Sequence, residues 1–188
     1  KCWIYPGSHG AETVSDAIGD SCNVFFYTTG FNLAAKDTGT YDDANGIAYI
    51  QKYASIYGLN QKTGIEIEEN TPEIATEFPV MAAIGQSDNN FTTVSLSRYV
   101  TAVASGKLYN YQLMSRIVDI NGNVIESYEP EYTDISDTLN AGQWDAIHSG
   151  MRMVVENLDS FEGFEIPVAG KTGTAQQIET RPNHALFV

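Results

Sequence analysis

The chain has 188 residues, a formal net charge of −14 at pH 7 and 43% hydrophobic residues. This length accommodates one domain with a buried core, and the hydrophobic content argues against a disordered chain. Because 24 aspartates and glutamates outnumber 10 lysines and arginines, the charge pattern argues against nucleic acid as a partner. We therefore expect a single acidic domain spanning residues 1–188.

The cysteine and histidine residues predict no metal centre. Cys2 and Cys22 are too few for a disulfide framework in a chain of this length. We expect two free thiols, and a single pair between them remains the alternative. His9, His148 and His184 are scattered, and no cysteine–histidine spacing matches that of a zinc site.

The two ends of the sequence suggest a section of a longer protein. The chain opens on Lys1-Cys2, without a methionine and without a signal peptide. No apolar stretch is long enough to span a bilayer. Any targeting or anchoring segment would then lie outside these residues.

The first predicted helix covers residues 13–18. Thr13 or Ser15 can cap its first turn, and the acidic residue that follows suits a helix start. Residues 1–12 before it hold proline and glycine and are expected to form a loop.

A second helix is predicted to begin near Asn23. Ser21 and Asn23 then lie at a break between two helices, where polar side chains can face a cleft. The alternative is structural: serine and asparagine often cap helices, and in this alternative both residues only cap the second helix.

The middle of the chain predicts a helix, a short strand and a second helix. Apolar residues recur at helical spacing between Thr40 and Tyr57, where Gly58 ends the helix. Residues 64–68 alternate in polarity and are compatible with a strand. The next helix starts after Thr92 or Thr93 and stops at Gly106.

The third quarter predicts a peripheral hairpin followed by the most regular helix. Apolar runs at 116–120 and 124–128 flank Asn121-Gly122-Asn123, and Asn-Gly accepts the positive φ angles of a hairpin turn. Residues 140–157 repeat apolar side chains at i, i+3, i+4 and i+7. His148 falls near that apolar face, where a partly buried, hydrogen-bonded histidine is expected.

A strand near the end carries the most informative stretch of the chain. Phe164, Ile166 and Val168 alternate with other residues and predict a half-buried strand that continues into the residues beyond. Glycines on both sides of Lys171 clear space for a ligand. A cation and two hydroxyls suit an anionic or carbonyl-bearing ligand. The stretch is Ala169-Gly170-Lys171-Thr172-Gly173-Thr174-Ala175-Gln176, and residues 184–188 are expected to return as an antiparallel strand.

In chain order, these stretches resemble the transpeptidase domain of penicillin-binding proteins. Ser21-Cys22-Asn23 is similar to the family's Ser-x-Asn motif, and residues 169–176 are similar to its Lys-Thr-Gly motif. The region from Ile84 through the hairpin most resembles the monofunctional class B proteins, which include the rod-elongation type. The other landmarks in the family's order are His9-Gly10, Thr63-Gly64-Ile65, Ile84-Gly85-Gln86-Ser87, Gly150-Met151-Arg152 and His184-Ala185-Leu186-Phe187.

One family motif has no counterpart in the chain. The acylated serine of the family belongs to a Ser-x-x-Lys motif, and no serine here has lysine three residues later. In the family this motif precedes Ser-x-Asn, so it would lie before Lys1. The resemblance therefore implies an internal piece of an α+β, β-lactamase-like fold, consisting of its mainly helical part, a partial antiparallel sheet and a peripheral hairpin.

The resemblance assigns a role to each candidate residue in acyl transfer from a D-Ala-D-Ala peptide. Ser21 would relay a proton to the leaving amine, and Asn23 would hydrogen-bond the amide of the substrate. Lys171 would add positive potential near the substrate carboxylate, which Thr172 and Thr174 would bind. Gly173 would let the substrate backbone lie along the strand, and the backbone N–H of Thr174 would contribute to the oxyanion site.

The resemblance also implies partners and a location. The expected ligands are the peptidoglycan stem peptide and β-lactam antibiotics, with no cofactor, on the outer face of the bacterial cytoplasmic membrane. Without the nucleophile, we expect no acylation by this chain alone. Because a piece of a domain exposes apolar surface, we also expect self-association through the edge at 186–188.

Other functions remain open at this stage. The principal alternative is a β-lactam sensor of the same fold, which would act as a binding module. A serine β-lactamase or D,D-carboxypeptidase is possible within the superfamily, although the hairpin insert favours a transpeptidase. The third alternative is an acidic structural domain whose motifs match by coincidence.

Overall fold

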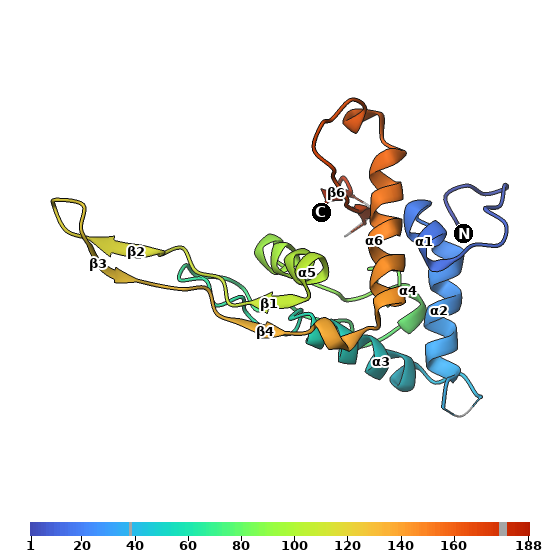
Figure 1. The fold of residues 1–188 in the computed structure, drawn as a ribbon. Helices are drawn as coiled ribbons and strands as arrows, with labels where there is room; N and C mark the ends of the chain where they lie inside the picture. The colour runs from blue at the N-terminus through green and yellow to red at the C-terminus, as the bar shows by residue number, and fades with distance from the viewer. Residues whose placement is uncertain (38, 177–179) are drawn as a thin grey trace. The chain divides into compact units, whose positions relative to one another are not determined.

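The computed structural model describes residues 1–37, 39–176 and 180–188 as a mixture of helices and small antiparallel sheets (Figure 1). Their contacts form two compact units. The first unit comprises Lys1–Gln51, Ala75–Asn89 and Leu139–Val188, and the second comprises Lys52–Ile74 and Asn90–Thr138. The α+β organisation is confirmed, whereas the single domain remains a prediction.

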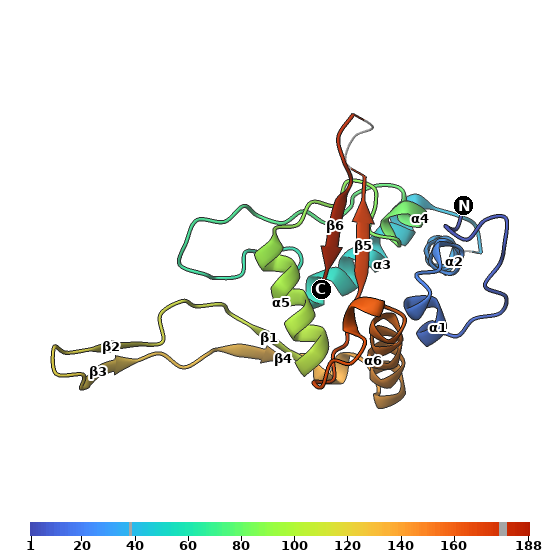
Figure 2. The same cartoon turned by 90° about the horizontal axis from the view of Figure 1, so that it is seen from above.

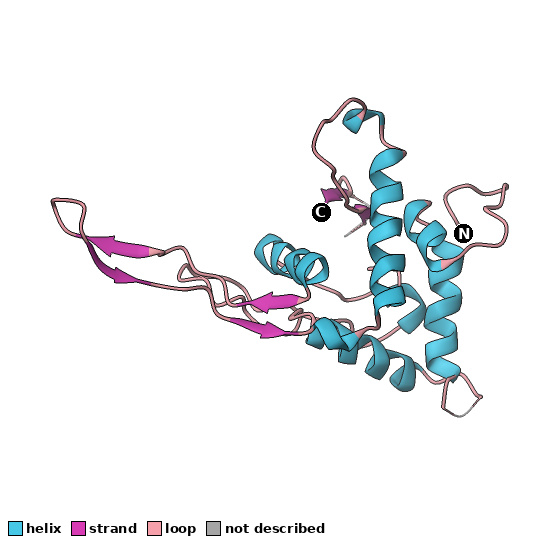
Figure 3. Cartoon of the chain, viewed as in Figure 1, coloured by secondary structure: helices cyan, strands magenta, loops and turns pink. Residues whose placement is uncertain are grey.

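The first unit holds most of the helices and one pair of strands (Figure 3). Its elements are α1 (Val14–Gly19), α2 (Asn23–Ala35), most of α3 (Asp43–Ile56), α4 (Pro79–Ala82), α6 (Ala141–Glu156), η2 (Asp159–Phe161), β5 (Thr172–Ala175) and β6 (His184–Phe187).

Helix α1 packs directly against α6 in this unit (Figure 1). The two helices can approach because position 150 is glycine, where a Cβ atom would stand 2.7 Å from Ile18 Cβ and 2.8 Å from the Ser15 carbonyl oxygen. The Ser15 hydroxyl also donates a hydrogen bond of 2.9 Å to the Ala146 carbonyl. Helix α1 is therefore held at a defined height along α6.

A second contact joins α2, α3 and α4 around Pro79. A Cβ atom at Gly30 would lie 2.7 Å from the Pro79 carbonyl oxygen, and one at Gly46 would lie 2.7 Å from the Pro79 ring. The neighbouring core contains Ile47, Ala75 and Ala82. Small residues thus let the helices around α4 come close together, which orients α2 and the turn that precedes it.

The second unit contains the end of α3, one further helix and four strands. These elements are α5 (Thr93–Ser105), β1 (Lys107–Tyr109), β2 (Arg116–Val118), β3 (Val124–Ser127), β4 (Tyr132–Asp134) and η1 (Ser136–Thr138). Strands β1 and β4 pair antiparallel, and β2 pairs with β3 to form the hairpin. Arg98 is 2% exposed, and its guanidinium donates a 2.9 Å bond to the Lys62 carbonyl, which fastens α5 to the loop before it.

Most helix predictions are confirmed at their caps. Thr13 and Asp16 form a capping box on α1, and Asn140 and Gln143 form another on α6. Thr92 caps α5 through its side chain, and the hairpin across residues 116–128 is present.

Two strand predictions are wrong, at residues 64–68 and at 164–168. At 64–68 and in the residues beside it, carboxylates bind backbone N–H groups in place of a neighbouring strand: Glu66 accepts from Leu113 at 2.7 Å, and Glu69 accepts from Thr63 at 2.5 Å. At 164–168 the chain is irregular: the Val168 carbonyl accepts from Arg152 of α6, the Phe164 N–H donates to the Phe161 carbonyl, and regular pairing begins only at Thr172.

His148 is exposed and stacks at a tilt against Trp144, with ring centroids 5.8 Å apart, so the partly buried position predicted for it is wrong. Among the residues that the structure describes, no helix combines the length and the hydrophobicity needed to cross a membrane.

Candidate active site

The Lys171 side of the site is an antiparallel pair, β5 with β6 (Figure 2). Directly before β5, the backbone N–H of Lys171 donates to the Val188 carbonyl at 2.8 Å, and Val188 N–H donates back at 3.1 Å. Thr172 then pairs with Phe187, and Gly173 pairs with Leu186. The predicted return strand is thus confirmed.

Gly170 is required because the chain passes very close to β6. A Cβ atom at this position would stand 2.5 Å from both the Phe187 ring and the Val188 carbonyl oxygen. The N–H of Gly170 instead donates to the Met151 carbonyl at 3.0 Å, and Arg152 donates to the Val168 carbonyl at 2.6 Å. Lys171 is therefore positioned by α6 and β6 together.

The Ser21 side is a tight turn between α1 and α2. The φ angle of Ser21 is 52°, in the left-handed region that side chains other than glycine seldom occupy. Two backbone bonds hold the turn, from Ser21 N–H to the Ile18 carbonyl at 3.3 Å and from Cys22 N–H to the Ala17 carbonyl at 3.0 Å. The Trp3 indole donates a further bond of 2.9 Å to the Asp20 carbonyl.

The two sides meet at one hydrogen bond. The Lys171 ammonium donates directly to the Ser21 hydroxyl, although the two residues are 150 positions apart in the chain. The ammonium also donates a hydrogen bond of 3.0 Å to the Thr172 carbonyl. Ser21 is thus oriented toward the lysine. The structural alternative, in which it caps α2, does not hold, because the N-cap of α2 is Cys22 and has no side-chain capping bond.

Helix α6 supports both sides of this contact. Its residue Gly150 receives α1, and Met151 and Arg152 bind the chain just before Lys171. Three consecutive residues of one helix therefore fix the separation between the Ser21 turn and the lysine. This explains why a stretch that contains no candidate catalytic group matters to the site.

The environment of Lys171 is less favourable to its charged form than water is. Burial lowers the pKa of the ammonium from its ordinary value, because desolvation penalises the charged state. The remaining candidates are more open: Asn23 is half-buried in the first turn of α2, while Thr172, Gly173 and Thr174 are exposed along β5. The site thus combines a partly desolvated lysine–serine pair with an accessible strand.

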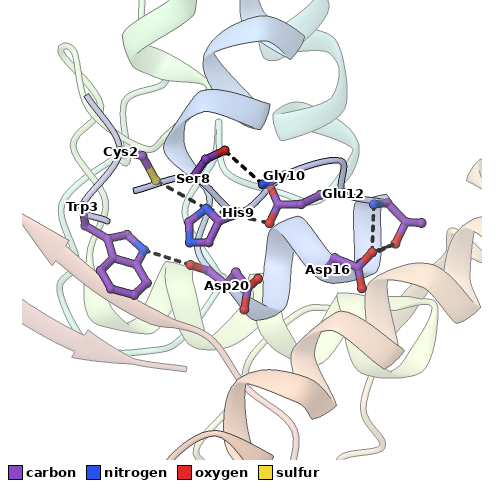
Figure 4. A network of polar contacts seen from close by, with 9 residues as sticks. Cys2, Trp3, Ser8, His9, Gly10, Glu12, Asp16 and Asp20 are labelled. Atoms are coloured by element: carbon purple, nitrogen blue, oxygen red, sulfur yellow. Dashed lines mark hydrogen bonds and ion pairs between the residues drawn. The ribbon is translucent and has the colours of Figure 1, made fainter. Parts of the chain in front are cut away.

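The structure also reveals a cluster beside Ser21 that the spacing of the sequence did not predict. Cys2, His9 and Cys22 each offer a ligand atom, and these atoms all lie within 4.8 Å of one another. Glu12 lies next to them, 3.9 Å from His9 Nδ1 (Figure 4). Both thiols are free, as predicted. Residues 2, 9 and 22 come together only through the fold of the N-terminal loop, so no local pattern could reveal them.

A separate cavity does not coincide with the candidate residues. A space of about 500 Å³ lies beside the end of α6, lined in part by Arg152, Phe161, Phe164 and Val168. None of the six candidate residues lines it. We therefore assign the site by the chemistry of Ser21 and Lys171 and not by cavity size.

Comparison with known proteins gives a consistent result. Residues 2–188 match the family model described as the penicillin binding protein transpeptidase domain. Penicillin-binding protein H of Bacillus subtilis is 28% identical over 181 residues, which cover 85% of this chain and 25% of that protein. Peptidoglycan D,D-transpeptidase MrdA of Haemophilus influenzae is 27% identical over 218 residues, covering 96% of this chain and 31% of that protein. The chain thus spans about a quarter to a third of these relatives.

Solved structures agree on the fold. Penicillin-binding protein 2B from Streptococcus pneumoniae superposes with a TM-score of 0.73 and 20% identity, over 93% of this chain and 32% of that one. Penicillin-binding protein A from Mycobacterium tuberculosis, in a ceftriaxone acyl-enzyme complex, gives a TM-score of 0.77 and 16% identity, over 96% of this chain and 40% of that one. The α+β fold predicted for a transpeptidase domain is confirmed.

Proposed function

The chain belongs to the penicillin-binding protein transpeptidase family, and on that premise we propose that it forms part of a peptidoglycan D,D-transpeptidase. In this proposal it carries the Ser21 and Lys171 sides of the active site. The observation that supports it most directly is the hydrogen bond between the Lys171 ammonium and the Ser21 hydroxyl. Two motif residues from opposite ends of the chain meet there as the reaction requires.

The proposed reaction is acyl transfer in two steps. A serine nucleophile attacks the penultimate D-Ala carbonyl, the peptide bond breaks, and the terminal D-Ala leaves after its amine gains a proton. An amine of a second stem peptide then attacks the acyl-enzyme ester, forms the cross-link and releases the serine. In the family this serine belongs to a Ser-x-x-Lys motif, so we propose that it lies outside residues 1–188.

Ser21 and Lys171 supply the proton route in this proposal. The Ser21 hydroxyl can donate a proton to the leaving amine and be reprotonated through its contact with Lys171. The lowered pKa of the lysine suits this role, since a group that holds its proton less tightly transfers it at a smaller cost. The left-handed turn at residue 21 aims the hydroxyl at the lysine.

The exposed strand supplies substrate binding. Thr172 and Thr174 alternate with Gly173 on β5, so both hydroxyls lie on the same face of the strand. They would bind the substrate carboxylate beside the charge of Lys171, while the Thr174 N–H stabilises the oxyanion. Gly173 leaves room for the substrate backbone, and Asn23 would hydrogen-bond its amide.

We further propose that the intact protein binds β-lactams on the outer face of the cytoplasmic membrane. Penicillin-binding protein A of M. tuberculosis forms acyl-enzyme complexes with ceftriaxone, imipenem and penicillin G. A sensor function of the same fold is less well supported, because the relatives cited above are named as penicillin-binding proteins or as a transpeptidase.

Covalent labelling with a fluorescent penicillin tests the function. The full-length protein should label, and Lys171→Ala should slow labelling by about 10–100-fold, the effect of losing a charge-assisted hydrogen bond. Lys62→Ala, which removes an exposed lysine of the second unit, is the matched control and should label normally. Equal labelling of Lys171→Ala and the wild type would overturn the proposed role. The 188-residue chain alone should not label.

A further inference from the structure

The segment that leads into the Lys171 strand is poorly packed. Residues 162–170 run from the end of α6 back to the β5–β6 pair (Figure 1). Two large apolar side chains of this segment remain open to solvent, Phe164 with 60% and Ile166 with 68% of its surface exposed. The cavity of about 500 Å³ beside the end of α6 is lined by residues of the helix and by residues of this segment. Packing therefore contributes little to the path of the segment.

Two hydrogen bonds to α6 define that path instead. Arg152 Nη1 donates to the Val168 carbonyl at 2.6 Å, and the Gly170 N–H donates to the Met151 carbonyl at 3.0 Å. Within the described part of the chain, the first of these is the only hydrogen bond that residues 165–169 make. It is also the one that a side chain supplies, so a substitution can remove it.

Glu156, one turn further along α6, orients this arginine. Arg152 Nε donates to Glu156 Oε1 at 2.9 Å, so the planar guanidinium binds the carboxylate with one nitrogen and the Val168 carbonyl with another. Hydrogen bonds from an ionised donor are stronger than those between neutral groups. An ordinary surface ion pair would join only the two helix residues, whereas this one extends to a backbone group outside the helix.

We propose that Arg152, oriented by Glu156, is a positioning residue for Lys171. It fixes the chain three residues before the lysine and so sets the contact between the Lys171 ammonium and the Ser21 hydroxyl. Arg152 acts through the backbone and takes no part in the reaction itself. The consequence for catalysis rests on the proposed function, whereas the structural restraint on Lys171 does not depend on it.

The short path from Val168 to Lys171 transmits this restraint. Three residues of extended chain span at most about 10 Å, so a shift at Val168 moves Lys171 unless the residues between them absorb it. Gly170 has little freedom to do so, because its N–H is bound to Met151 and a Cβ atom there would stand 2.5 Å from the Val188 carbonyl oxygen. On its other side, Lys171 is paired with Val188 through both backbone groups.

A displaced ammonium would slow the reaction more than it would weaken substrate binding. Proton transfer needs its donor and acceptor within hydrogen-bond reach, and a misplacement of about 1 Å can lower a rate by up to about 100-fold. The residues that bind substrate in the proposed mechanism, Thr172–Thr174, are held by their pairing with β6. Loss of the Arg152 bond should therefore lower the rate constant of acylation and leave the dissociation constant of the penicillin complex nearly unchanged.

The first experiment separates acylation from binding in the full-length protein. Arg152→Met keeps the apolar stem of the side chain and removes its donors. The acylation rate constant for a fluorescent penicillin should fall by about 3–10-fold, which corresponds to the loss of one hydrogen bond. This constant counts only molecules that react, so misfolding would lower the amplitude of labelling and not the constant. Arg152→Lys should recover part of the loss, because lysine can reach the carbonyl but cannot bind both partners as a fork. Arg116→Met, at an exposed arginine of β2, is the matched control and should react like the wild type.

Two further measurements identify the cause of that loss. Glu156→Gln should slow acylation by about 2-fold, as expected for an exposed ion pair, and should add nothing to Arg152→Met, since Glu156 acts only through the arginine. In the 188-residue chain, Arg152→Met should accelerate hydrogen exchange of the Gly170 amide by about 3–10-fold and leave the amides of α5 in the second unit unchanged. The exchange measurement needs no activity, so its outcome is independent of the proposed function. The melting temperature should change by less than about 4 °C, because the side chains of Arg152 and Glu156 are 45% and 55% exposed.

The possible results decide between positioning and a merely structural role. The proposal is overturned if Arg152→Met acylates at the wild-type rate, if the loss appears in the dissociation constant instead, or if exchange at Gly170 is unchanged. It is also overturned if Arg152→Lys recovers nothing. Additive effects of Glu156→Gln and Arg152→Met would overturn the part assigned to Glu156. A wild-type protein that does not label would overturn the proposed function, and exchange at Gly170 would then decide alone whether Arg152 holds the strand.

Discussion

The turn at Ser21 combines a functional hydroxyl with a strained backbone, and two substitutions separate them. Ser21→Ala removes the hydroxyl and keeps a side chain at a φ angle of 52°. Ser21→Gly also removes the hydroxyl but suits the left-handed region. A difference in stability between the two variants therefore measures the backbone strain at residue 21. An effect that both variants show measures the loss of the hydroxyl.

The structure sets the size of both effects. A side chain in the left-handed region costs about 1–2 kcal/mol, which glycine avoids. Glycine loses more conformational entropy on folding, and this offsets about 0.5–1 kcal/mol of that difference. Ser21→Gly should therefore be more stable than Ser21→Ala by about 1 kcal/mol. Both lose the bond from the half-buried Lys171 ammonium, whose value is at the lower end of the charge-assisted range, about 1.5 kcal/mol.

Two assays apply. Thermal or urea unfolding of the chain should place Ser21→Gly above Ser21→Ala by roughly 2–4 °C. Penicillin labelling of the full-length protein should fall by about 100-fold in both variants, as expected for the loss of a proton relay. Ser149→Ala, an exposed serine on α6, is the control. Full labelling of Ser21→Gly would refute the role of the hydroxyl, and equal stability of the two variants would refute the strain argument.

Three further predictions concern the elements around the site. Gly170→Ala should destabilise the chain by about 1–3 kcal/mol in urea unfolding, because its Cβ would meet the Val188 carbonyl at 2.5 Å. The control is Gly142→Ala on α6, whose Cβ would make only an ordinary contact of 3.5 Å, and this variant should be neutral or stabilising. The pKa of Lys171 is lowered in the folded chain, while in the unfolded chain it keeps its ordinary value near 10.4. Between these two pKa values the unfolded state binds more protons, so the free energy of unfolding rises with pH. The stability of the wild type relative to Lys171→Met should therefore rise through this alkaline window, and a flat difference would contradict the burial of the ammonium. Asn140→Ala removes the N-cap of α6 and should cost about 1 kcal/mol, or roughly 2–4 °C in melting temperature, and an unchanged melting temperature would show that the cap contributes nothing.

The elements that can be predicted from the sequence are those whose signals are local. Thr13, Thr92 and Asn140 mark helix starts because a side-chain oxygen satisfies an N–H within the same turn. Asn121-Gly122 predicts its hairpin for a similar reason, since the turn conformation depends on those residues alone. The ordered motifs around Ser21 and Lys171 also indicate the family, because they are properties of the sequence alone.

Features that depend on distant partners follow only from the packing of the folded chain. Alternation at residues 164–168 predicts a strand, yet the Val168 carbonyl binds Arg152 of α6 and the Phe164 N–H binds the Phe161 carbonyl. A strand forms only where another strand is available to pair. The meeting of Ser21 with Lys171 and of Cys2 with Cys22 likewise depends on how α1, α6 and the N-terminal loop pack. The residue types determine which contacts are chemically favourable, and the packing of the folded chain determines which of these contacts form.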